Sequence, residues 1–187
     1  MVANLVNEEQ SLQMTAQEQE ASEYIGCSVG IMAYNEEANI ERTLRAILDQ
    51  QSLNTRIEEV IVVASGCTDH TVPLVDVIAR QEPKVSLYVQ EKREGKASAI
   101  NLFLKQATSQ VVVLLGADVI PEASALENLC APFKDPTIGM VGGRPVPVND
   151  PSTFMGHAIH LLWRLHDRVA RVSPKLGEII AFRNVIS

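Results

Sequence analysis

The chain has 187 residues, of which 46% are hydrophobic, which suffices for one domain with a sizeable core but not for two. Its 23 acidic residues outnumber its 16 basic residues, and the net charge of −7 argues against a general nucleic-acid-binding surface. The three cysteines, Cys27, Cys67 and Cys130, lack the close spacing of metal sites or redox motifs, so we expect free thiols in a reducing compartment.

The start of the chain differs in composition from the rest. Residues 1–24 carry five glutamates and no lysine or arginine, which predicts a solvated, disordered acidic lead-in. We therefore place the folded domain at 25–187. The sequence has no secretory signal pattern and no run of about 20 apolar residues that could span a membrane. A cytoplasmic location is expected, with peripheral contact at a membrane left open.

Short apolar runs alternate with helical patterns through most of the domain. The runs are nearly continuous Val, Ile and Leu, which is typical of parallel strands covered by helices on both faces. Strands are predicted at 27–33, 58–65, 84–90, 111–116 and 138–143, and helices at 36–50, 68–81, 95–107 and 122–134. This order predicts an α/β fold with a doubly wound, mostly parallel sheet flanked by helices.

A further helix is predicted from Ser152 to Arg171 because apolar residues recur there at three- and four-residue intervals. The apolar stripe consists of Phe154, Ala158, Leu161, Leu162, Leu165 and Val169. The helix either packs on the core with a solvated basic face, as we expect, or docks on anionic lipid or a phosphate-bearing acceptor. Its histidines, His157 and His160, lack the spacing of a helical zinc site.

Ligands of such sheets bind beyond the carboxyl ends of the strands, so the loops after the strands are the place to look for a site. After the first strand, Asn35 can cap the next helix, and Glu36 and Glu37 suit the positive end of its dipole. After the second strand, Asp69 can act as a cap in the same way. A purely structural role would explain each of these residues.

Two later loops offer more specific chemistry. Gly95 and Lys96 follow the third strand and open a helix, where backbone N–H groups and a lysine can meet phosphate; a solvated charged loop is the alternative. Asp118 follows the apolar run 111–116 as its single acid, just before Pro121. Its carboxylate suits Mg²⁺ or Mn²⁺, which take oxygen ligands together with substrate phosphates.

The order and spacing of these loops resemble the nucleotide-sugar-binding half of family 2 glycosyltransferases, an inverting group with the GT-A fold. The resemblance runs from about Cys27 to Arg183. The matching segments are the Tyr-Asn-Glu-Glu of Tyr34 to Glu37, the turn Cys67-Thr68-Asp69, the "GKASAIN" of Gly95 to Asn101, and Asp118 as the last position of an Asp-x-Asp motif.

The resemblance implies a metal-assisted glycosyltransferase that moves a sugar from a nucleotide-sugar, expected to be a UDP-sugar, to an acceptor with inversion. It implies that Asp118 binds Mg²⁺ or Mn²⁺. The donor site that it implies consists of Ala33, Tyr34, Asn35, Glu36, Asp69, Gly95, Lys96, Asn101, Gly116, Ala117 and Asp118. The acceptor stays open as a glycan, a lipid phosphate or a small molecule.

The chain departs from the family pattern at several positions. Ala64 stands where the family often has an aspartate, Gly116 replaces the first aspartate of Asp-x-Asp, and Met32 replaces a common proline. The catalytic base of the family, an aspartate further downstream, has no counterpart and is expected beyond Ser187, so we expect a domain truncated at its C-terminus. Asp167 and Glu178, the acids nearest that region, are expected to be ion-pair partners or surface groups.

Two other functions fit parts of the sequence. A non-catalytic nucleotide-sugar-binding or assembly module is favoured by Ala64, by Gly116 and by the lack of a base. A nucleotidyltransferase would need a glycine-rich, basic loop after the first strand, where this chain has the acidic residues 34–37. A dinucleotide dehydrogenase is excluded because no Gly-x-Gly-x-x-Gly follows that strand.

Overall fold

A computed structural model describes residues 24–172 and 178–184 of the chain. The predicted lead-in 1–24 lies outside the described residues except for Tyr24, which is exposed. The strands are β1 (Ile25–Ala33), β2 (Thr55–Ser65), β3 (Val85–Gln90), β4 (Val111–Gly116), β5 (Met140–Gly142) and β6 (Ile179–Arg183). The helices are α2 (Ile40–Leu48), α3 (Thr71–Gln81), α4 (Lys96–Gln106), α5 (Ala125–Cys130), the 3₁₀ helix η1 (Ala131–Lys134) and α6 (Phe154–Val172).

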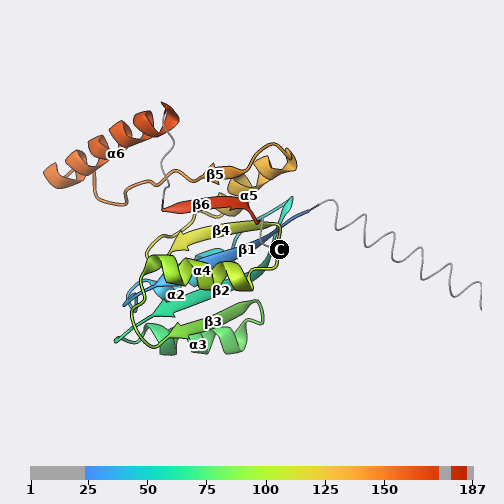
Figure 1. The fold of residues 1–187 in the computed structure, drawn as a ribbon. Coiled ribbons are helices and arrows are strands. Elements are labelled where there is room, and N and C mark those ends of the chain that lie inside the picture. The colour runs from blue at the N-terminus through green and yellow to red at the C-terminus, as the bar shows by residue number, and fades with distance from the viewer. Residues whose placement is uncertain (1–23, 173–177, 185–187) are drawn as a thin grey trace, which may run out of the picture.

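All six strands form one sheet in the order β3-β2-β1-β4-β6-β5 (Figure 1). β1 runs parallel to β2 and to β4, and β2 runs parallel to β3. β6 runs antiparallel to β4 and to β5. The predicted α/β fold with a mostly parallel sheet is therefore confirmed, and each predicted strand lies within a few residues of its observed bounds.

Both faces of the parallel part of the sheet are covered by helices. Successive residues of β2 are buried on opposite faces, Val62 in a cluster with residues of α2, α3 and α5, and Val63 in a cluster with residues of α4. Phe103 of α4 is fully buried on the second face. A strand buried on both faces has no polar alternation, which explains the continuous apolar runs of the sequence.

Two helices begin or end differently from the sequence prediction. α2 starts at Ile40 rather than at residue 36, because Asn35 has a positive φ of 54° and the Glu36 carbonyl oxygen closes a turn with the N–H groups of Asn39 and Ile40. The helix predicted at 122–134 is α-helical only in α5. Pro132 lies in the first turn of η1, where its missing N–H group cannot donate to an α-helical hydrogen bond.

α6 does not pack on the core of the described chain, so the expected packing is wrong. Figure 1 shows the helix standing away from the sheet, beyond β5 and β6. Its apolar stripe is exposed, with 86% of Phe154 and 65% of Leu162 accessible to solvent. The reason is that α2, α3, α4 and α5 already cover the apolar faces of the sheet. Asp167 is an ion-pair partner, as expected, since Arg144 Nε lies 3.4 Å from its Oδ1.

The described helices were also compared with what a membrane span requires. In residues 24–172 and 178–184, no helix combines the length and the apolar character needed to cross a bilayer.

The three cysteines are free thiols, as expected. Cys27 and Cys130 are distant in sequence but are both fully buried in the same cluster. Hydrogen bonding with Cys130, together with burial, raises the pKa of the Cys27 thiol far above its ordinary value. Both thiols therefore act as small apolar groups of the core.

Candidate functional site

The carboxyl ends of the four parallel strands meet at one edge of the sheet. The register pairs Ala33 of β1 with Ala64 of β2 and Met32 with Gly116 of β4. Ser65 pairs in turn with Gln90, the last residue of β3. The loops that carry the predicted site residues therefore leave the sheet at the same edge, as the rule for ligand sites in parallel sheets requires.

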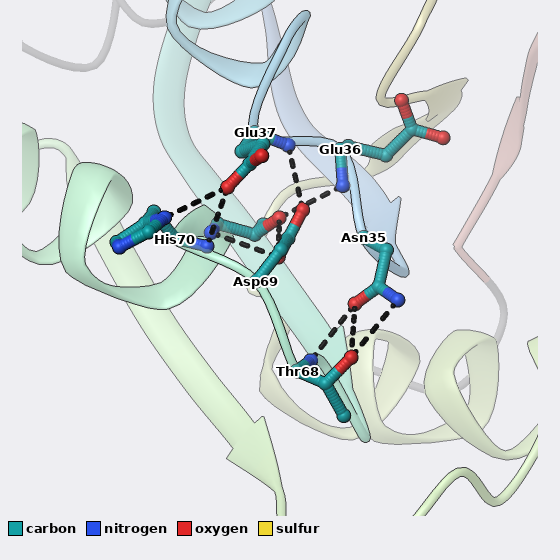
Figure 2. A network of polar contacts seen from close by, with 7 residues as sticks. Asn35, Glu36, Glu37, Thr68, Asp69 and His70 are labelled. Carbon is teal, nitrogen blue, oxygen red and sulfur yellow. Dashed lines mark hydrogen bonds and ion pairs between the residues drawn. The ribbon is translucent and has the colours of Figure 1, made fainter.

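Asn35 ties the loop after β1 to the loop after β2 (Figure 2). Its Oδ1 accepts a hydrogen bond of 2.8 Å from the backbone N–H of Thr68, and its Nδ2 donates one of 3.2 Å to the Thr68 hydroxyl. The expected role of Asn35 as a helix cap is therefore wrong. Its side chain is used between loops, and α2 begins five residues later.

A second set of bonds between the same loops centres on Asp69. Its Oδ2 accepts a hydrogen bond of 3.0 Å from the Glu37 N–H, and its Oδ1 accepts bonds from the N–H and the hydroxyl of Thr71. The Thr71 hydroxyl in turn accepts a bond of 2.8 Å from the Glu36 N–H. Glu37 Oε2 accepts a bond from the His70 N–H and lies 2.9 Å from His70 Nδ1. We name Asn35, Glu36, Glu37, Thr68, Asp69, His70 and Thr71 the loop bridge.

The loop bridge favours two ionised carboxylates. Desolvation acts to raise the pKa of Asp69, but hydrogen bonds donated by Thr71 and by the Glu37 backbone lower it below its ordinary value overall. Bonds from the His70 backbone and ring hold the pKa of Glu37 below its ordinary range. Glu36 and Glu37 were expected in the first turn of α2, and that placement is wrong, because both precede the helix and serve the bridge.

Tyr34 lies beside the third loop of the site. The Arg93 guanidinium sits 3.9 Å from the centre of the Tyr34 ring, a cation–π contact. The Arg93 backbone passes close to Gly66, since a Cβ at Gly66 would lie only 2.4 Å from the Arg93 nitrogen. Gly66 also has a φ of +66°, so both space and conformation require glycine at this turn. No local signal in the sequence marks Arg93 as part of the site, because its contact with Tyr34 joins two distant loops.

Gly95 precedes α4, Lys96 is its first residue and Asn101 lies in its middle. Gly95 precedes the helix with a φ of 90°, a conformation that favours glycine, and Lys96 and Asn101 are exposed. A helix turns by about 100° per residue, so Lys96 and Asn101 point to different sides of α4. The structure thus brings Lys96 and the first N–H groups of α4 to the site edge, but it does not bring Asn101 onto the same face.

Ala33 is the last residue of β1 and Gly116 the last residue of β4, and Ala117 and Asp118 follow Gly116 in the loop after β4. Ala33 and Ala117 are buried, and the Ala117 carbonyl oxygen accepts a 2.8 Å bond from Thr43 of α2. Asp118 is exposed. Its carboxylate has no hydrogen bond or ion pair with any of the residues that the structure describes.

The oxygen donors at this edge suit a divalent cation that is held partly by its substrate. In the described part of the chain, no three His, Cys, Asp or Glu residues are grouped closely enough to hold an ion by themselves. Mg²⁺ and Mn²⁺ do not need such a cage, because they are commonly held by one or two carboxylates and by substrate phosphates. An exposed, unpaired carboxylate such as that of Asp118 fits this requirement.

Glu178 lies directly beside Gly116, which the sequence did not reveal. The Gly116 N–H donates a hydrogen bond of 3.3 Å to the Glu178 carbonyl oxygen. Glu178 is exposed and directly precedes β6. Only the antiparallel pairing of β4 with β6 brings it to the edge, and no local signal in the sequence predicts that pairing.

The comparisons with known proteins agree with this geometry. A family model described as Glycosyl transferase family 2 matches residues 28–183. The chain is 33% identical over 132 residues to a poly-beta-1,6-N-acetyl-D-glucosamine synthase of Staphylococcus aureus, and the match covers 70% of this chain and 31% of the relative. The chain thus spans about a third of the length of the curated relatives that it matches.

Solved structures give the same result at the level of the fold. The mannosyltransferase PcManGT from Pyrobaculum calidifontis, in complex with GDP-Man and Mn²⁺, superposes with a TM-score of 0.65 at 31% identity, covering 84% of this chain and 44% of that one. S. aureus TarS 1–349 in complex with UDP-GlcNAc superposes with a TM-score of 0.53 at 25% identity, covering 66% of this chain and 37% of that one. The sheet, the loops at its edge and these matches lead to one conclusion: the chain belongs to glycosyl transferase family 2, a family of enzymes, and has the GT-A fold.

Proposed function

We propose that this chain binds a nucleotide-sugar donor and takes part in transferring its sugar, with inversion, to an acceptor hydroxyl. The observation that carries the proposal is the exposed and unpaired carboxylate of Asp118 at the end of β4, at the same edge as the loops after β1 and β2. The mannosyltransferase at 31% identity was solved with GDP-Man and Mn²⁺, which supports a donor and a metal of these kinds.

The residues at the edge have distinct roles in the proposal. The Tyr34 ring, stacked with Arg93, offers an aromatic surface for a base. The loop bridge fixes the backbone of residues 34–37 with hydrogen bonds to residues 68–71, so the donor meets a preformed surface. Lys96 and the N–H groups at the start of α4 offer positive charge to phosphate. Gly95, Gly116 and Ala117 complete the proposed donor site, whereas Asn101 points to another side of α4 and is left out of it.

Asp118 holds Mg²⁺ or Mn²⁺ in this proposal. When bound, the ion neutralises charge on the departing diphosphate. Asp118 fits this role because its oxygens have no partner among the described residues and are accessible at the edge of the sheet. No residue is assigned as the catalytic base.

A non-catalytic binding module remains the second candidate, because two observations favour it. Ala64 and Gly116 replace acids of the family pattern, and Ala64 is fully buried in the core, so it offers no polar group to a base or ribose. A module of this kind would bind the donor but would not transfer the sugar. A nucleotidyltransferase has lost support, because residues 34–37 belong to a family 2 chain.

The acceptor is proposed to be a glycan, a lipid phosphate or a small molecule, and α6 suggests contact with anionic lipid. α6 has an exposed apolar stripe and carries three arginines against one aspartate. An amphipathic helix with this charge suits the surface of an anionic membrane.

Sedimentation with vesicles of anionic and of neutral lipid tests this contact. Replacing Leu162 and Leu165 by Ser should abolish binding, and equal binding by parent and variant would refute it.

The donor is tested by thermal shift against UDP-, GDP- and dTDP-sugars, with and without Mn²⁺. A ligand that binds only the folded state raises the melting temperature by mass action. We expect one nucleotide class to raise it, and to do so more strongly with Mn²⁺. If no nucleotide shifts the melting temperature, the proposed function is wrong. A transfer assay with the donor found in this way then separates an enzyme from a binding module.

A further inference from the structure

The end of β4 lacks one acid that the resemblance leads us to expect, because Gly116 stands at the first position of Asp-x-Asp. Carboxylates nevertheless face this position from two sides. A Cβ added at Gly116 would lie 2.8 Å from Oδ1 of Asp118 and 3.9 Å from Oε2 of Glu178. The space that a side chain would fill is therefore bordered by Asp118 of the loop after β4, by Val119 Cγ2 at 3.4 Å and by Glu178, which precedes β6.

The sheet fixes the position of Glu178. β6 runs antiparallel to β4, with Leu115 opposite Ile179, so the amino end of β6 meets the carboxyl end of β4. The hydrogen bond from the Gly116 N–H to the Glu178 carbonyl oxygen continues this pairing by one step. The backbone of Glu178 is thus anchored next to Gly116, and its Oε2 already lies close to the space beside Gly116.

The two carboxylates have no counter-charge within the described residues. Both side chains are exposed, and neither forms a hydrogen bond or an ion pair there. Two carboxylates that face one small space repel each other unless a cation or a proton lies between them. Mg²⁺ and Mn²⁺ are commonly held through one or two carboxylates, with substrate phosphates and water completing the shell.

We propose that Glu178 supplies the second carboxylate of the cation site, in place of the side chain that is missing at Gly116. This inference rests on the proposed function, which already assigns the cation to Asp118. The small residue at position 116 leaves the space in which the two acids can meet. The chain therefore retains two carboxylates at this edge, with one of them moved to a neighbouring strand.

The test is a titration with Mn²⁺, followed by the loss of its electron paramagnetic resonance signal, in the presence of UDP and in a parallel series with GDP. The variants are Glu178→Gln and Asp118→Asn, both of which remove a charge and keep the size of the side chain. Glu82→Gln is the matched control, because Glu82 is exposed and precedes β3, at the opposite edge of the sheet.

We expect Glu178→Gln to weaken Mn²⁺ binding by about 10-fold or more, since loss of even an outer partner of a metal ligand costs about 10–100-fold. Glu82→Gln should bind as the parent does. If Asp118→Asn loses Mn²⁺ while Glu178→Gln matches the control, the role of Glu178 is refuted and the proposed function stands. If the parent binds no Mn²⁺ with either nucleotide, both proposals are wrong.

A rescue experiment separates a ligand from a structural residue. In the Glu178→Gln background, Gly116→Asp places a carboxylate in the gap from β4 itself. The new Cβ would lie 2.8 Å from Asp118 Oδ1, so the Asp118 carboxylate has to shift, which the far end of a flexible side chain can do at small cost. We expect this double variant to recover most of the lost Mn²⁺ affinity. Failure to recover, with an unchanged melting temperature, would count against a shared cation site.

Discussion

The segment from Ile25 to Lys134 supplies most of the buried core, whereas α6 exposes its apolar stripe. In the first region, residues such as Val62 and Phe103 are fully enclosed between the sheet and its helices. In the second region, Leu161, Leu162 and Leu165 are each more than half exposed. The same kind of apolar periodicity therefore leads to different environments, because burial depends on which surfaces remain uncovered.

The candidate site lies at the edge of the sheet, away from the apolar stripe of α6. The loop bridge and Asp118 come from the parallel region, while Glu178 directly precedes the antiparallel strand β6, which follows α6 in sequence. Variants in each region should therefore separate the stability of the core from the binding of ligands.

The largest effect is expected from a cavity in the parallel region. Phe103→Ala should lower the free energy of unfolding by about 3–5 kcal/mol, because it removes a fully buried ring of α4. Leu162→Ala on α6 is the matched control and should change stability by no more than about 0.5 kcal/mol. Chemical denaturation measures both. If both variants lose the same free energy of unfolding, α6 is packed in solution, and the difference in burial between α6 and the parallel region does not hold.

Asp118→Asn should come next, with an effect on binding rather than on stability. Removing the charge while keeping the size should eliminate the metal-dependent part of nucleotide binding, a loss of about 10-fold or more. Isothermal titration with UDP and with GDP, each with Mn²⁺, measures it. Glu122→Gln, an exposed acid of the same loop, serves as the control. If the variant binds UDP and GDP in the presence of Mn²⁺ as tightly as the parent does, the metal is not held by Asp118.

Asp69→Ala should have a smaller effect on stability, together with an effect on the site. Both oxygens of this carboxylate accept hydrogen bonds in the loop bridge, and loss of such capping bonds costs about 0.5–2 kcal/mol. Nucleotide affinity should fall by more than this, since residues 34–37 lose their support. A lower melting temperature with unchanged affinity would limit Asp69 to a structural role.

The smallest expected effect is on the stability of the fold at low pH. Hydrogen bonds from His70 lower the pKa of Glu37 in the folded state. The ionised Glu37 side chain therefore stabilises the fold above its unfolded-state pKa of about 4.3. This stabilisation is lost as the pH falls through the folded-state pKa. Glu37→Gln should therefore flatten the pH dependence of the melting temperature below about pH 4.5 and change little at pH 7. Parallel curves for parent and variant would contradict this link.

Much of the fold could be predicted from the order of apolar runs, and less of the site. The strand 111–116 has the predicted bounds, because a strand buried on both faces is continuous in the sequence. The predicted start of α2 was wrong because the Asn35 side chain accepts a hydrogen bond from Thr68, which is distant in sequence. The roles of Tyr34, Lys96 and Asp118 in binding remain predictions, since the structure places them at one edge but does not test their affinity.

The sequence by itself determined the parallel α/β order, the family and the position of Asp118 at the end of a buried strand, because these depend on local periodicity and on short motifs. Only the tertiary structure decided that Glu178 lies beside Gly116, that Arg93 stacks on Tyr34 and that α6 stands away from the core. These three features depend on how distant segments pair and on which sheet surfaces are already covered. Neither the pairing nor the covering can be predicted from residues that are neighbours in the sequence.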